Sequence, residues 1–275
     1  LTVDLVPPEQ RGNALALTQV GHSASRVLGP AVAGLFLAWA FSRATGAYLA
    51  MAAFYTASAA GLLLLPRSVV RAGARDTHVL ADIAAGLRYV RGQRRLRLML
   101  LLFVSVIMIG YPHVTVLPGL LEHSLGRDAH GVATLFGVAA VGALAASLWV
   151  ARFADSSHAL RIYTGMALLF GVSLVGLALA PSYAGALVAM FAIGVGSGGF
   201  QSLNAAVIVR ETDTAFFGRV TSLSTLAFAG FGLMGLPIGL LADALGERAA
   251  LGIMGGAVLA IALWLGAKLR VTDVA

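Results

Sequence analysis

Three polar side chains share one face of an otherwise apolar segment near the start of the chain. Gln19, His22 and Arg26 follow i, i+3, i+7 spacing, which places them on one side of a helix. An amide, an imidazole and a guanidinium can bind a polar ligand, and imidazole exchanges protons near neutral pH. A guanidinium at the bilayer centre costs at least ~2.5–3.5 kcal/mol, so it normally faces a protein interior or a watery cavity. We therefore expect a substrate or proton path here; a buried ion pair and helix–helix hydrogen bonds are the alternatives.

Two further groups of polar residues lie inside apolar runs. Tyr111 and His113 flank a proline, and Gln201 and Asn204 are spaced i, i+3 after the glycine-rich run Gly194–Gly199. We expect these four side chains to line the same path. A structural proline kink is the alternative for the first pair. The glycines before the second pair are expected to allow close helix packing.

The composition is that of a membrane protein. Hydrophobic residues make up 59% of the chain and charged residues 11%, whereas soluble domains carry about 25% charged residues. The net charge of +7 does not indicate nucleic-acid binding, because the arginines cluster at the ends of apolar runs. Cysteine is absent and the histidines lack metal-binding spacing, so we expect no metal, no cofactor and no enzymatic activity.

Eight runs are long enough to cross a bilayer, which needs about 20 mostly apolar residues. The sequence therefore predicts an all-α polytopic membrane protein. Prolines inside these runs predict kinks, and they are Pro30, Pro112, Pro118 and Pro237. The runs are 13–41, 45–65, 97–121, 131–152, 161–180, 183–209, 219–242 and 249–267.

The basic residues predict the orientation. With both chain ends inside, 15 of the 19 lysines and arginines fall in inside segments and three fall outside, with Arg26 in the membrane. Cytoplasmic segments carry the excess of basic residues in membrane proteins. We therefore expect both ends of this chain in the cytoplasm.

The longest connection, 66–96, divides the chain into an earlier part, 1–65, and a later part, 97–275. An apolar stripe within it predicts an amphipathic helix. Such a helix lies along the inner leaflet of the membrane, or alternatively serves as a solvated linker. The stripe consists of Leu80, Ile83, Ala84, Leu87 and Val90.

A weak internal repeat gives the helix numbering. Arg11-Gly12 is followed by a Gly-Pro element at Gly29-Pro30, and Gly218-Arg219 by a similar element at Pro237, about 206 residues further on. Duplicated six-helix halves would give this spacing, as in many transporter folds. The first run would then be the fifth of twelve helices, with about four helices preceding Leu1. Chance similarity between Gly/Ala/Leu-rich helices is the alternative.

With these features the chain resembles the major facilitator superfamily. Pro7-Pro8-Glu9-Gln10-Arg11-Gly12 resembles the connection between its fourth and fifth helices. Ser25 to Gly34, with Gly29 and Pro30, is similar to the antiporter motif G-x-x-x-G-P-x-x-G-G of its drug exporters, although Ser25 and Ala33 replace glycines.

Two further segments are similar to parts of this family. Gly86 to Arg91 and Tyr111 to Pro118 resemble siderophore (enterobactin-type) and macrolide exporters. The loop containing Asp155 resembles the family's inter-helix signature G-x-x-x-D-R-x-G-R, of which the aspartate and a trailing arginine remain. The resemblance implies that Asp155 approaches Arg11-Gly12 and closes the cytoplasmic side. Arg219 marks the corresponding helix start in the repeat.

The resemblance implies helices 5–12 of a plasma (inner) membrane exporter driven by protons, with an amphipathic small molecule as substrate. No acidic residue lies within the apolar runs, so the proton carrier is expected upstream of Leu1 or at His22 or His113. Uptake or sensing on the same fold, or a membrane scaffold or enzyme, are the alternatives.

Overall fold

The computed structural model describes residues 43–63, 79–127, 129–153, 156, 158–213 and 216–274. The chain divides into two compact units, Leu1–Asp76 and Thr77–Ala275. In the first unit the structure describes helix α2 (Arg43–Leu63), which corresponds to the second predicted span. The predicted span 13–41, with Pro30, lies outside the described residues. The second unit, called unit 2 below, contains all the other described helices.

Unit 2 holds six helical stretches that are long and apolar enough to cross a membrane. The first, Arg94–Ser124, is built from several consecutive segments. The described part of the chain contains no strand, and the prediction of an all-α polytopic membrane protein is confirmed. The other five stretches lie in α6 (Ala129–Ala151), α7 (Ala159–Leu179), α8 (Tyr183–Glu211), α9 (Phe217–Leu245) and α10 (Glu247–Val274).

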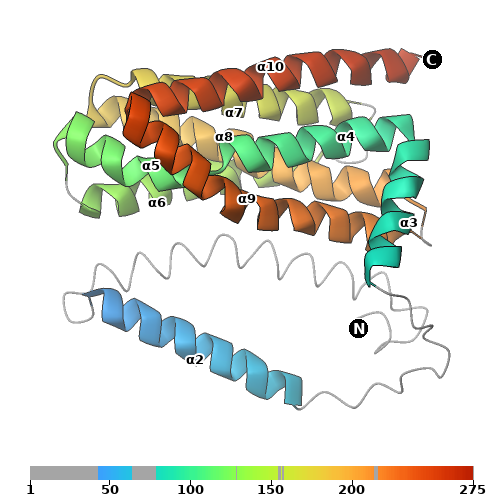
Figure 1. The fold of residues 1–275 in the computed structure, drawn as a ribbon, viewed down its shortest axis with the longest axis horizontal. Coiled ribbons are helices and arrows are strands. Elements are labelled where there is room, and N and C mark those ends of the chain that lie inside the picture. Colours follow the sequence, from blue (N-terminus) through green and yellow to red (C-terminus); the bar gives the residue numbers. More distant parts are fainter. Residues whose placement is uncertain are drawn as a thin grey trace. The chain divides into compact units, whose positions relative to one another are not determined.

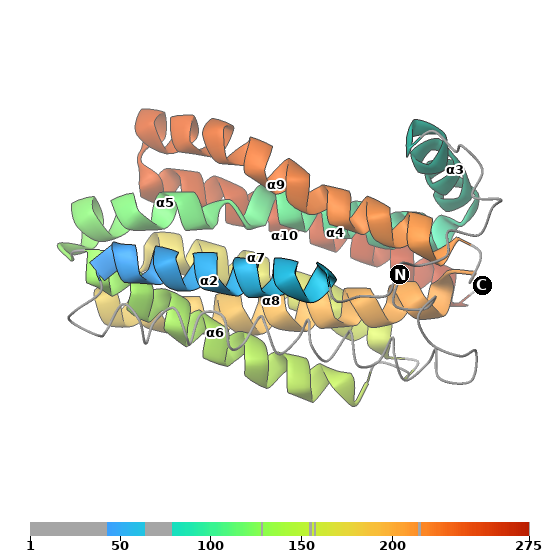
Figure 2. The same cartoon turned by 90° about the horizontal axis from the view of Figure 1, so that it is seen from below.

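The membrane-length helices of unit 2 run side by side along one common direction (Figure 1). Helix α8 packs against both α6 and α7, and α10 packs against α7. Figure 2 shows α9 and α6 on opposite edges of the unit. The largest buried side chains include Tyr163, Phe170 and Phe200, and the ring of Tyr163 in α7 stacks on that of Phe200 in α8.

Glycines bring α6 and α8 into close contact. A Cβ atom on Gly194 would collide with the carbonyl group of Ala139, and one on Gly198 would overlap the backbone of Ala143. In the other direction, a Cβ on Gly142 would collide with the Phe191 carbonyl. Small residues allow such approach between membrane helices. The packing role expected for the glycine-rich run before Gln201 is thus confirmed.

The first stretch of unit 2 is interrupted near its middle. Helix α4 (Arg94–Ser105) continues as a π-helical segment, η2 (Val106–Gly110). After a turn at Tyr111 and Pro112, helix α5 (His113–Gly119) and a second π-helical segment, η3 (Leu120–Ser124), complete the stretch.

Pro112 explains the interruption, and the break predicted there is confirmed. Proline has no backbone N–H to donate to the preceding turn. Side chains bind carbonyl groups at the break: His113 Nδ1 lies 2.8 Å from the Gly110 carbonyl oxygen, and Thr115 Oγ1 donates at 2.7 Å to the Pro112 carbonyl, which also accepts the Thr115 backbone N–H. Pro118 lies inside α5 and Pro237 inside α9.

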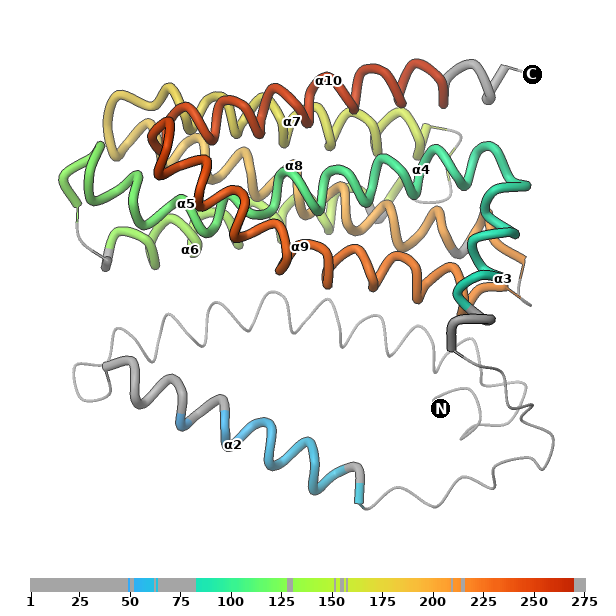
Figure 3. The backbone as a smooth tube through the Cα atoms, in the orientation of Figure 1, coloured from blue at the N-terminus to red at the C-terminus, as the bar shows by residue number. Residues whose placement is uncertain are grey.

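Helix α3 (Val79–Gly92) is the amphipathic helix of the connection before α4. It lies across the end of the spanning helices, and the chain turns sharply between α3 and α4 (Figures 1 and 3). The predicted apolar stripe divides between two environments. Val90 is buried in a small core with Leu96 and Val220, whereas Ala84 and Leu87 are exposed.

Candidate functional site

A tyrosine and a glutamine meet inside the membrane-spanning part of unit 2. Gln201 in α8 donates a hydrogen bond from Nε2 to the hydroxyl group of Tyr111, at the turn between η2 and α5. Two aromatic rings flank Tyr111: the ring centroid of Phe170 lies 5.4 Å away and that of Phe228 lies 6.4 Å away. The proline-induced turn presents Tyr111 towards α8, which explains how two residues so distant in sequence meet.

The amide of Gln201 has unused hydrogen-bonding capacity. Its Oε1 atom is buried and has no hydrogen-bond partner among the described residues. Buried polar atoms are nearly always paired, so an unpaired one needs an explanation. An acceptor held among aromatic rings suits a ligand that offers a hydrogen-bond donor and an apolar surface.

Asn204 occupies a different environment from Gln201. Its side chain is 4% exposed, and its Oδ1 atom accepts a hydrogen bond from the Tyr163 hydroxyl at 3.3 Å. The same hydroxyl lies 3.2 Å from the Met99 carbonyl oxygen, and the Tyr163 ring stacks on Phe200. Asn204 therefore joins α7, α8 and α4 in the core, one helical turn from Gln201.

His113 is also buried, with 5% of its surface exposed. Besides contacting the Gly110 carbonyl through Nδ1, its ring lies edge-on to Phe170, with 5.9 Å between centroids. Phe170 thus touches both His113 and Tyr111, and the two predicted residues share one aromatic neighbour.

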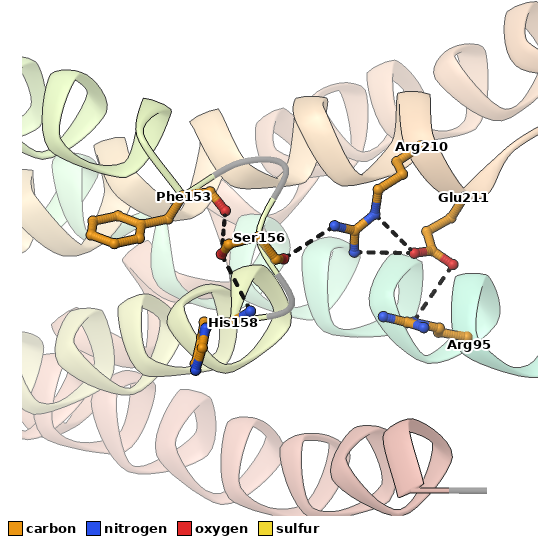
Figure 4. A network of polar contacts seen from close by, with 6 residues as sticks. All are labelled: Arg95, Phe153, Ser156, His158, Arg210 and Glu211. Atoms are coloured by element: carbon orange, nitrogen blue, oxygen red, sulfur yellow. Dashed lines mark hydrogen bonds and ion pairs between the residues drawn. The ribbon is translucent and has the colours of Figure 1, made fainter.

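A polar network joins three elements at the end of unit 2 where α8 ends (Figure 4). Glu211 binds Arg95 of α4 at 3.5 Å and Arg210 at 3.2 Å. Arg210 also donates to the Ser156 carbonyl at 3.3 Å, in the connection between α6 and α7. Ser156 Oγ in turn donates to the Phe153 carbonyl and accepts the His158 backbone N–H.

A second cluster lies beside this network and fixes α3. The Tyr89 hydroxyl lies 3.1 Å from a carboxylate oxygen of Asp213 and accepts the Asp213 backbone N–H at 3.1 Å. The Tyr89 ring stacks on Phe216 at 4.2 Å, and the guanidinium of Arg219 lies 5.6 Å from the same Phe216 ring. The predicted motif residue Arg219 therefore sits where α3 meets the start of α9.

The remaining predicted residues lie outside the described part of the chain. They are Arg11, Gly12, Gln19, His22, Arg26, Gly29, Pro30 and Asp155. Ser156, the neighbour of Asp155, is described and is held by Arg210. Within the described ranges, no group of three or more His, Asp or Glu side chains is arranged to hold a metal ion.

Sequence reasoning missed Glu211 and its two arginine partners. Membrane orientation correlates with basic residues only, so an acidic residue at a helix end carries no signal for it. The adjacent pair Arg210-Glu211, after a long apolar run, was the available signal. Phe170 and Phe228 were also missed, because aromatic residues in apolar runs are indistinguishable by composition from core residues.

Comparison with known protein families gives a clear result. Residues 1–229 match the model of the Major Facilitator Superfamily. The chain belongs to the major facilitator superfamily. Comparison with curated proteins gave no match.

Membership in the major facilitator superfamily identifies a multi-pass membrane transporter. The six apolar stretches of unit 2 agree with this assignment. A transporter of this superfamily binds small-molecule substrates within the bilayer, and the polar residues inside its spans are candidates for that binding.

We expect His113→Leu to lower stability, because the Gly110 carbonyl loses its side-chain partner in a buried position. A buried acceptor without a donor costs about 1–3 kcal/mol. Thermal unfolding of the purified transporter in detergent measures the change, and His113→Asn, which retains a donor, should recover part of it. An unchanged unfolding temperature in His113→Leu would contradict the structural role.

Proposed function

We propose that the chain forms helices 5–12 of a twelve-helix exporter in the plasma (inner) membrane, with both ends of the chain in the cytoplasm. The transporter moves an amphipathic small molecule, of the drug or siderophore class, outward in exchange for protons. Residues 1–65 complete the first helical bundle, 66–96 connect the bundles and 97–275 form the second. The two bundles alternate access to a site near the membrane midplane.

The pairing of Tyr111 with Gln201 carries the proposal for the substrate. A glutamine oxygen without a partner, a tyrosine hydroxyl and the rings of Phe170 and Phe228 offer hydrogen bonds beside apolar surface. Ligand sites combine a mostly apolar lining with a few placed polar groups. On the other bundle, Gln19, His22 and Arg26 are proposed to complete the path.

The setting of His113 favours a proton carrier elsewhere. Its ring is buried, and Nδ1 is engaged by a backbone carbonyl. A proton carrier must exchange protons with water or substrate during transport. We therefore assign this role to a group upstream of Leu1 or to His22.

Gating on the cytoplasmic side is proposed to involve Asp155, Arg11 and Gly12, with the Gly29-Pro30 element allowing the fifth helix to bend. Arg210 supports this arrangement, because it holds the backbone next to Asp155 through Ser156. A carboxylate near a helix start gains from the helix dipole and from a neighbouring arginine.

Removing one hydroxyl group tests the substrate site. We expect Tyr111→Phe to raise the KM for export about tenfold, because hydrogen bonds to a bound ligand are worth about 0.5–1.5 kcal/mol and Gln201 also loses its partner. Transport is measured with the full-length protein in inverted vesicles energised by a proton gradient, using a compound to which expression confers resistance.

Tyr183→Phe is the matched control, because its hydroxyl donates to the Gly131 carbonyl, away from the Tyr111–Gln201 pair. It should leave the KM unchanged. Equal effects of the two variants would exclude the proposed substrate site. Accumulation driven in the opposite direction would instead favour the uptake alternative.

A further inference from the structure

Helix α3 has two faces with different surroundings. On one face Gly86 is buried, with a Cβ position 3.1 Å from Cβ of Arg219, and Val90 belongs to a buried cluster. Tyr89 on the same side is held by Asp213 and Phe216. These contacts fix α3 to the start of α9 and to the connection between α8 and α9.

The opposite face of α3 is exposed and both apolar and basic. Ala84, Leu87, Arg88 and Arg91 follow i, i+3, i+4, i+7 spacing, so they lie on one side of the helix. All four are exposed, and 41% of the Leu87 surface is accessible.

The basic character continues beyond the end of α3. Arg94 and Arg97, at the start of α4, are also exposed, and Arg97 donates to the Arg91 carbonyl at 3.1 Å. This bond holds the two arginine-bearing segments together. Four exposed arginines, Arg88, Arg91, Arg94 and Arg97, thus follow the exposed Leu87 within ten residues of the chain.

The direction of α3 matches the plane of a membrane surface. The spanning helices of unit 2 run along one direction, and α3 crosses their end at a steep angle (Figure 1). A helix that crosses the ends of membrane-spanning helices lies roughly parallel to the bilayer surface. Interfacial helices place an apolar strip at the headgroup boundary and use arginine or lysine to bind anionic lipid.

We propose that this exposed face of α3 binds anionic phospholipid of the adjoining leaflet. Leu87 enters the boundary between headgroups and acyl chains, and Arg88, Arg91 and Arg94 bind the lipid phosphates. Because Tyr89 and Gly86 couple α3 to α9, bound lipid also steadies the start of α9. The proposal depends on neither the transported substrate nor the direction of transport.

A single cysteine label gives a spectroscopic test, because these 275 residues contain no cysteine; any cysteine elsewhere in the full-length transporter is first replaced by serine. Leu87→Cys in the full-length transporter is labelled with an environment-sensitive fluorophore and reconstituted into nanodiscs. The discs contain phosphatidylcholine alone or phosphatidylcholine mixed with phosphatidylglycerol. We expect a blue shift and slower hydrogen exchange of residues 79–92 with phosphatidylglycerol, and reversal of both at high salt.

Two double variants distinguish lipid binding at the exposed face of α3 from a general effect of positive charge on the protein. R88Q/R91Q should lower the apparent affinity for phosphatidylglycerol about tenfold, since each arginine near an anionic membrane surface contributes to the free energy of binding. R152Q/R161Q removes two other exposed arginines that the orientation places on the same side of the membrane, and it should keep the full response.

The proposal is overturned if phosphatidylglycerol leaves the fluorescence and exchange of α3 unchanged, or if the two double variants lose the response equally. A response to soluble glycerol phosphate in the phosphatidylcholine discs would also overturn it, because the ligand would then be a free phosphate. If R88Q/R91Q fails to fold, the salt dependence of the labelled parent protein decides the outcome.

Discussion

Glu211→Gln should lower the rate of transport about tenfold and reduce the unfolding temperature. The glutamine keeps the size of the side chain but removes the charge that holds Arg95 and Arg210. Both arginines are about one-third exposed, so solvent screening limits the loss to about 1–2 kcal/mol. A change of 1.4 kcal/mol corresponds to a tenfold change in an equilibrium.

The effect on transport follows from the loop that Arg210 holds. Without Glu211, Arg210 is free to leave the Ser156 carbonyl, and the segment carrying Asp155 loses its support. Transport assays on E211Q, D155A and the double variant therefore form a thermodynamic cycle. We expect a coupling of about 1–2 kcal/mol, because residues in one network do not act additively.

The control for this cycle is Glu122→Gln, the same chemical change at an exposed residue in η3. It should leave transport close to that of the parent protein. Additive effects of E211Q and D155A would contradict the positioning role of Glu211, and the ion pairs would then serve stability alone.

The second large effect is expected where α6 and α8 touch. Gly194→Ala adds a methyl group that collides with the Ala139 carbonyl, and backbone cannot move aside as a flexible side chain can. Overpacking of this kind costs about 1–3 kcal/mol of stability. We expect a loss in the upper part of that range, because the two helix backbones are already in close contact. The measurement is the thermal unfolding midpoint of the purified protein in detergent.

Gly176→Ala is the matched control within α7. Nothing lies within 4 Å of its added Cβ, so the substitution should be neutral or slightly stabilising through helix propensity, by up to about 1 kcal/mol. Equal unfolding temperatures for the two variants would contradict the prediction, because α6 and α8 could then move apart at Gly194 without a loss of stability.

The spanning helices were predictable because lipid imposes a simple rule on length and composition. The later six predicted runs each coincide with a helical stretch, and their ends differ by a few residues. Pro112 was also informative, since its missing N–H coincides with a break in the span, whereas Pro118 and Pro237 lie within helices that continue past them. Family membership agrees with the resemblance seen in the motifs.

The direction in which polar residues face was not predictable from spacing. Gln201 and Asn204 share a face of α8, yet Asn204 pairs with Tyr163 and Gln201 pairs with Tyr111. The difference depends on which neighbouring helix places a tyrosine hydroxyl beside each of these two residues. Periodicity describes one helix, whereas these contacts depend on the packing of three.

The amphipathic helix illustrates the same limit. Its apolar stripe predicted one face against the inner leaflet, but Val90 packs on protein while Leu87 is exposed. Hydrophobicity alone does not distinguish a protein neighbour from a lipid neighbour. The stacked pair of Tyr89 and Phe216 decides which way α3 turns.

The π-helical segment before Tyr111 has a geometric consequence for everything that follows it. A π-helical turn accommodates one more residue than an α-helical turn, and each residue of an α-helix advances the azimuth by about 100°. Segment η2 therefore sets the rotation of α5 about its axis relative to α4. Converting η2 to regular α-helix would turn Tyr111 by about that angle, away from Gln201. The register of a single backbone turn thus determines which polar groups of this span can face one another.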